Sequence, residues 1–195
     1  MNPKSRRMLA GFFLTAALTV FFSPLGAMDI FKARMMTEKA PALPAMIDIQ
    51  IEVTSWTTLE EIRQLLDIMG TSGADAFLAA FSKADKGVAR FMFSGGWNVP
   101  IHAAIMVPAE KGKKVLLFFN RQNWDPGSFQ QLGRNSFMAM ELKLNEKGKG
   151  NGRFYEDVQI KLNSFAATIE IETYESAPKF FPQVQEVVKK TGDKK

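Results

Sequence analysis

The stretch "IDIQIEVTSWTTLEEIRQLLDIMG", Ile47 to Gly70, decides the fold because its hydrophobic period changes partway along. From Ile47 to Val53, apolar and polar residues alternate, which is typical of a strand with one buried face. From Leu59 to Met69, apolar residues recur at helical spacing behind a pair of threonines that can cap a helix, with acidic residues in the first turn. The stretch therefore predicts a strand followed directly by an amphipathic helix.

A second helix is predicted immediately after Gly70, a residue type that commonly ends helices. Ser72 can cap this helix, and Asp75 follows three residues later. One face of this helix then carries the apolar side chains Ala74, Phe77, Leu78 and Phe81. The pattern ends at Asp85-Lys86-Gly87. The two predicted helices are joined by only about three residues, so we expect a tightly packed pair.

The remaining chain is typical of strands with short connections. Apolar or alternating runs lie at residues 88–93, 99–107, 115–120, 137–144, 154–162, 165–174 and 183–188. Short connections favour antiparallel pairing, because a parallel crossover needs about a dozen residues or more. We therefore expect an α+β fold: a curved antiparallel β-sheet or open barrel of about seven to eight strands, with a two-helix insertion after the first strand. The alternative is a β-sandwich.

The N-terminus has the three-part pattern of a secretory signal peptide. Basic residues come first, an apolar run from Leu9 to Phe22 follows, and small residues lead to Ala27. The apolar run is shorter than the roughly 20 residues that cross a bilayer. We expect export to the periplasm or the medium after cleavage near Ala27, with no stable transmembrane segment afterwards. An uncleaved anchor is the alternative.

The sequence then divides into four segments. Residues 1–27 are the predicted signal peptide, and residues 28–45, with two prolines and no clear period, are interpreted as a linker or an N-terminal wrap. Residues 46–188 form one predicted α+β domain. Residues 189–195 are a predicted basic, disordered tail.

Composition excludes several classes of function. The chain carries a net charge of +5, but its two ends hold the excess, and residues 28–188 carry −1. A near-neutral body does not indicate nucleic-acid binding. The chain has no cysteine and one histidine, which excludes disulfides and the common structural zinc sets. We expect no metal and no cofactor.

The single histidine raises the question of catalysis. His102 lies in a predicted strand within "FSGGWNVPIHAAIMV", and no nucleophile-elbow pattern accompanies it. An envelope hydrolase would have to combine His102 with Arg121 and Asp125, and we keep this as the alternative function. A polar residue on a strand face is the simpler interpretation of His102.

The chain is rich in phenylalanine and methionine, with 17 and 11 residues, respectively. Such side chains suit an apolar ligand held by a curved sheet. We therefore expect a non-catalytic exported protein that binds a small apolar ligand or an envelope protein, while a fully packed core is the competing outcome. The candidate ligand-binding residues are Phe91, Phe93, Phe118, Phe137, Phe154, Met138 and Met140.

Four longer stretches resemble an uncharacterised group of exported bacterial proteins. They are "SWTTLEEIRQLL", "GADAFLAAFSKADKGVARF", "FMAMELKLNEKGKGNGRF" and "IEIETYESAPKFFPQVQEV". The resemblance covers most of residues 47–188 and implies export, but it implies no reaction and no ligand. Where the group has an aspartate after a central strand, this chain has Asn120, so a carboxylate role at that position is not carried over.

Overall fold

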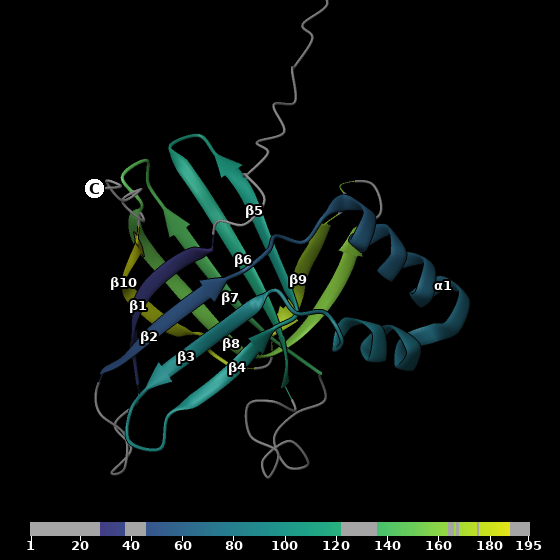
Figure 1. Ribbon diagram of the computed structural model, residues 1–195, viewed down its shortest axis with the longest axis horizontal. Coiled ribbons are helices and arrows are strands. Elements are labelled where there is room, and N and C mark those ends of the chain that lie inside the picture. The colour runs from purple at the N-terminus through teal and green to yellow at the C-terminus, as the bar shows by residue number, and fades with distance from the viewer. Residues whose placement is uncertain are drawn as a thin grey trace, which may run out of the picture.

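The computed structural model describes residues 28–37, 46–121, 136–163, 166, 168–174 and 176–187. These residues form one helix, α1 (Leu59–Phe81), and ten strands (Figure 1). The strands are β1 (Asp29–Met36), β2 (Met46–Val53), β3 (Gly87–Met92), β4 (Trp97–Ile101), β5 (Ala103–Ala109), β6 (Gly112–Asn120), β7 (Phe137–Leu144), β8 (Lys149–Asn163), β9 (Thr168–Tyr174) and β10 (Lys179–Val187).

The ten strands belong to one sheet in which neighbouring strands are antiparallel. The order is β4-β3-β2-β1-β10-β8-β7-β6-β5, and β9 pairs with the far half of β8. The first and last strands of this order are consecutive in the chain, with only His102 between them. The backbone N–H of His102 donates to the carbonyl oxygen of Phe118 on β6 at 2.9 Å. The sheet therefore curls until its two edges approach each other at His102, while β4 and β5 stay unpaired with one another among the described strands.

The expectation of a curved, open antiparallel sheet is confirmed, but the expected strand count is wrong. Asp29–Met36 lies in the segment that the sequence pattern assigns to a linker or wrap, yet it is β1 and sits between β2 and β10. Its alternating side chains Phe31, Ala33 and Met35 are buried. The single strand expected at residues 99–107 is divided at His102 into parts of β4 and β5. The strands form one sheet, so the sandwich alternative does not apply.

The expected pair of helices is one helical element. α1 runs from Leu59 to Phe81 and is kinked at Gly73, where φ is 82° and ψ is −175°. That conformation is open to glycine and strained for other residues, so Gly73 allows the change of direction without a connecting loop. Figure 1 shows the bent helix standing beside β9 and the adjoining part of β8. In the described part of the chain, we find no helix with the length and apolar character needed to cross a membrane.

The curled sheet separates two hydrophobic layers. The inner layer fills the concave side with the side chains of alternate strand residues. The outer layer lies between α1 and the convex side of β5 to β9. It consists of Ile62, Phe77, Phe81, Ala103, Ile105, Leu116, Phe118, Ala139, Tyr155, Val158 and Ile169.

The start of α1 has the reciprocal cap that the sequence predicts. The side-chain oxygen of Thr58 accepts from the backbone N–H of Glu61 at 3.2 Å, and Glu61 Oε2 accepts from the backbone N–H of Thr58 at 2.7 Å. The other oxygen of Glu61 lies 2.5 Å from Lys86 Nζ, just before β3. The helix start is therefore joined to the sheet through Glu61.

We expect Glu61→Gln to reduce the loss of stability in acid. Partial burial raises the pKa of Glu61, but hydrogen bonds from Lys86 and Thr58 outweigh it and hold the pKa below its ordinary value of 4.5. A carboxyl with a lowered pKa in the folded state stabilises that state above its unfolded pKa, and this contribution is lost as the pH falls through the folded pKa. Urea unfolding measured between about pH 6 and pH 3 should therefore show that the free energy of unfolding falls less steeply for the variant than for the wild type. An unchanged decline, equal to that of Glu60→Gln, would contradict this.

Candidate functional site

A buried polar cluster lies where the two edges of the sheet meet. His102 is 6% exposed, and its Nδ1 donates to the carbonyl oxygen of Ala84 at 2.7 Å, just past the end of α1. Its ring lies 5.5 Å from the ring of Phe81, measured between centroids. Asn120 at the end of β6 donates through Nδ2 to Ser82 Oγ at 2.7 Å. These contacts join the end of α1 to the sheet.

Arg121 and Asp157 form a buried ion pair beside this cluster. Arg121 Nη1 lies 2.8 Å from Asp157 Oδ2, and the two side chains are only 9% and 5% exposed. Asp157 lies where the pairing of β7 and β8 shifts register, opposite Met138. Such bulges redirect side chains. The shift brings the carboxylate of Asp157 to the guanidinium of Arg121, the residue directly after β6, so the pair ties the end of β6 to β8.

This arrangement does not support the hypothesis that His102 and Arg121 belong to a hydrolase active site. His102 and Arg121 are both buried, and each is engaged by a partner that belongs to the framework. Asp125, the third residue of that hypothesis, lies outside the described residues. The contacts of His102 and Arg121 support a structural role, in which polar groups hold strand ends and the helix end together.

We expect His102→Ala to destabilise the protein and His102→Asn to destabilise it less. The amide of asparagine can keep the hydrogen bond to Ala84, whereas alanine leaves that buried carbonyl without its donor, which costs about 1–3 kcal/mol. Neither variant should alter ligand binding, because His102 faces the framework. Equal stability of the two variants in urea unfolding would show that the hydrogen bond contributes nothing.

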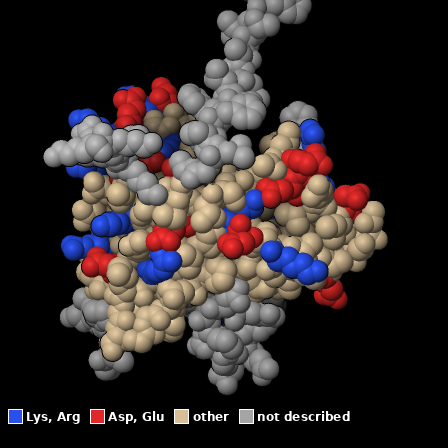
Figure 2. All heavy atoms as spheres, in the orientation of Figure 1, with Lys and Arg blue, Asp and Glu red and all other residues tan. Residues whose placement is uncertain are grey.

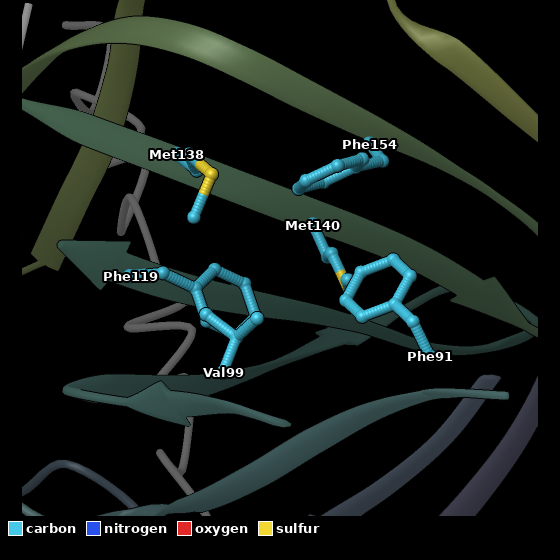
Figure 3. A pocket seen from close by; sticks show the side chains of 6 residues that line it. All are labelled: Phe91, Val99, Phe119, Met138, Met140 and Phe154. Carbon is cyan, nitrogen blue, oxygen red and sulfur yellow. The ribbon is translucent and has the colours of Figure 1, made fainter. Parts of the chain in front are cut away.

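The centre of the inner layer brings together four of the seven candidate ligand-binding residues. Phe91, Phe154, Met138 and Met140 point toward one another across the concave side (Figure 3). Val99 and Phe119 complete the group. The rings of Phe91 and Phe154 are 5.7 Å apart. The space among these side chains leaves no room for a water molecule, so this centre is packed core in the structure.

The other three candidate residues lie elsewhere. Phe93 stacks edge-on against Trp97, with centroids 5.1 Å apart, at the margin of the inner layer. Phe118 belongs to the outer layer beneath α1, and Phe137 packs against that layer. Phe137 meets Phe81 edge to face at 5.2 Å. The seven residues are therefore divided between the two hydrophobic layers and do not line one cavity.

A solvent-open hollow of about 600 Å³ lies at the end of the sheet where the β5–β6 and β7–β8 turns stand side by side. We call it the lysine groove. It is lined by Val107, Pro108, Ala109, Lys111, Lys113, Lys114, Lys143, Leu144, Asn145, Lys149, Gly150 and Asn151. Five of these residues are lysines and none is acidic, so the lining presents positive charge.

The central feature of the lysine groove is a pair of like charges. Lys114 on β6 is directly opposite Lys143 on β7, and the same row continues to Val107 on β5 and Asn151 on β8. Like charges directly opposite each other on neighbouring strands destabilise a sheet. Lys143 has one acidic neighbour, Glu141, at 3.5 Å on its own strand.

The other lysines of the groove differ in how far they are neutralised. Lys113 Nζ lies 2.5 Å from Glu186 on β10. Lys111, Lys114 and Lys149 form no ion pair with any residue that the structure describes. On the face drawn in Figure 2, basic and acidic side chains are interspersed. The groove is therefore a local excess of positive charge on a body that is nearly neutral.

Two similar turns build the groove. The tetrapeptide Glu-Lys-Gly-Lys occurs at residues 110–113 and again at 146–149. Gly112 has a φ of 123°, and a Cβ there would lie 2.0 Å from the carbonyl oxygen of Leu144. Glycine thus allows the first turn to approach the end of β7. The repeated tetrapeptide is the sequence signal that could have revealed the groove, because two copies of one glycine-containing segment indicate two similar turns.

Comparison of the chain with protein-family models, with curated proteins and with solved structures gave no match.

Proposed function

We propose that the protein is an exported, non-catalytic binding protein of the bacterial cell envelope, and that the lysine groove binds phosphate-bearing ligands. The observation that carries this proposal is the cross-strand pair Lys114 and Lys143 within a hollow that has no acidic lining residue. An anion between the two ammonium groups would replace their mutual repulsion with two attractions. Export rests on the N-terminal sequence pattern.

The chemistry of the lining favours phosphate among anions. A lysine ammonium is a compact charge with three donors, and it binds phosphate without the planar geometry that arginine imposes. Asn145 and Asn151 add amide groups to the lining. The volume of about 600 Å³ is that of a small-molecule site, large enough for a lipid headgroup or a soluble phosphate compound.

The groove also offers apolar surface, as expected for a protein that binds an apolar ligand. Its lining includes Val107, Pro108, Ala109 and Leu144 beside the lysines. A ligand with an anionic head and an apolar portion would contact both kinds of surface. The inner layer would have to open to admit an apolar ligand, because its centre is filled.

The proposal is tested with two sources of phosphate. Calorimetric titration with pyrophosphate measures binding of a soluble compound, and co-sedimentation with phosphatidylglycerol or phosphatidylcholine vesicles measures binding of lipid. We expect Lys114→Ala/Lys143→Ala to weaken whichever binding the wild type shows by at least about tenfold, roughly the effect of losing two charge-assisted contacts. Lys32→Ala/Lys83→Ala removes the same charge at exposed positions outside the groove and should bind as the wild type does.

Two results would overturn the proposal. One is that the wild type binds neither pyrophosphate nor phosphatidylglycerol at low salt. The other is that both double variants lose binding equally, which would show that only net charge matters. Raising the salt concentration from about 0.05 M to 0.5 M should weaken true groove binding, because exposed charges are screened. Intact-mass measurement of the protein from the envelope or the medium tests export separately, with loss of residues 1–27 expected.

A further inference from the structure

The lysine groove borders a group of charged and aromatic side chains on the same face of the sheet. Glu141 lies two residues along β7 from Lys143 and is directly opposite Arg153 on β8. Phe180 on β10 is in turn directly opposite Arg153. Side chains two residues apart on one face of a strand are about 7 Å apart, so this row lies immediately beside the groove.

Contacts between side chains continue from the groove across this row. Lys143 Nζ lies 3.5 Å from Glu141 Oε1, and the hydroxyl of Tyr155 donates to the other carboxylate oxygen at 3.4 Å. The ring of Tyr155 lies 5.2 Å from the ring of Tyr174 on β9, measured between centroids. One connected surface therefore leads from the groove to β9. We call its five members beyond the groove the aromatic platform: Glu141, Arg153, Tyr155, Tyr174 and Phe180.

The side chains of the platform that solvent reaches combine apolar rings with hydrogen-bonding groups. Tyr174 is 52% exposed and Phe180 is 44% exposed, and Arg153 is also exposed. An aromatic ring offers an apolar face against which the C–H groups of a sugar ring can pack, and tyrosine adds a polar hydroxyl. A carboxylate accepts hydrogen bonds from ligand hydroxyls, and a guanidinium donates to them. The platform thus suits a ring that carries several hydroxyl groups.

We infer that the aromatic platform binds the organic part of a ligand whose phosphate lies between Lys114 and Lys143, and that this part is a polyhydroxylated ring, as in a sugar phosphate. The inference rests on the proposed binding of phosphate by the groove. The negative charge of Glu141 disfavours a second phosphate on the platform, whereas neutral hydroxyl groups can donate to its carboxylate. The spacing of about 7 Å between the two rows is close to the size of one sugar ring attached to a phosphate.

Calorimetric titration with glucose 1-phosphate and glycerol 3-phosphate tests the inference, because the two compounds carry the same phosphate group and only the first has a ring. We expect the wild type to bind glucose 1-phosphate at least about fivefold more tightly, which corresponds to one aromatic contact. Tyr174→Ala/Phe180→Ala should bind both compounds with the affinity that the wild type has for glycerol 3-phosphate. Met46→Ala/Met92→Ala removes two exposed apolar side chains on β2 and β3 and should keep the preference.

A second arm distinguishes a lipid source of the ring from a soluble one. Phosphatidylinositol carries a polyhydroxylated ring on its phosphate, and phosphatidylglycerol does not, so co-sedimentation with vesicles of each lipid measures the same preference at a membrane surface. A preference for the ring in either arm that Tyr174→Ala/Phe180→Ala abolishes supports the inference. Equal binding of the paired probes in both arms would overturn it and leave the groove as a phosphate site. If the wild type bound none of the four probes, the inference and the proposed function would both be overturned.

Discussion

Replacing Arg121 with methionine should lower the free energy of unfolding by about 3–5 kcal/mol. The substitution leaves the carboxylate of Asp157 buried without its cation, and the penalty is large because Asp157 is almost fully buried. Asp157 Oδ1 already has no hydrogen-bond partner among the described residues, so Arg121 supplies the main compensation for burying this charge.

The double variant Arg121→Met/Asp157→Leu separates the free-energy penalty of an unpaired buried charge from the net contribution of the ion pair to stability. Removing both charges should restore most of the lost stability, because apolar residues of similar volume can replace a buried ion pair at little cost. Urea unfolding of the wild type, both single variants and the double variant gives the coupling energy directly. If the double variant were as unstable as the sum of the two single variants, the ion pair would not be the coupled unit we describe.

Replacing Phe81 with alanine should lower the free energy of unfolding by about 3–5 kcal/mol. The ring is fully buried at the end of α1 and contacts Phe77, Phe137 and His102. It therefore joins three parts of the fold: the helix, β7 and the segment where the edges of the sheet approach each other. Loss of the ring leaves a cavity at the point where α1 is held against the sheet.

Hydrogen exchange should show where the effect of Phe81→Ala is concentrated. Amides of α1 are expected to lose protection more than those of β1 and β2, which pack on the inner layer. Leu59→Ala provides the matched control, because Leu59 is on the same helix and is 48% exposed. That control should change stability by less than about 1 kcal/mol. If Phe81→Ala and Leu59→Ala lost similar amounts of stability, α1 would not be held against the sheet through its C-terminal half.

Local patterns account for the parts of the fold that could be predicted. The alternation from Ile47 to Val53 is β2, and the helical stripe with its threonine cap is the first part of α1. Both signals depend on neighbours within a few residues of sequence. The runs predicted as strands at residues 137–144 and 154–162 lie in β7 and β8, which pair antiparallel. Short links also predict antiparallel pairing, which the sheet confirms.

Features that depend on distant partners escaped prediction. β1 alternates only through Phe31, Ala33 and Met35, and its neighbour β10 is about 150 residues away along the chain. No short-range sequence pattern shows that β4 and β5 belong to opposite edges of the sheet, so the burial of His102 could not be predicted. The lysine groove depends on the β6–β7 register that places Lys114 opposite Lys143. A net charge averaged over the body hides such a local excess.

The lysine groove is the central claim, and mapping of backbone amide shifts during titration with pyrophosphate tests it most directly. In nuclear magnetic resonance spectra, the largest shifts should gather at residues 111–114 and 143–151, which form the two turns and their strand ends. The amides around His102 and Arg121 should move little, because those residues are buried in the framework. The account would be contradicted by shifts that gather around His102 and Arg121, or by a spectrum in which the residues of the groove stay unchanged.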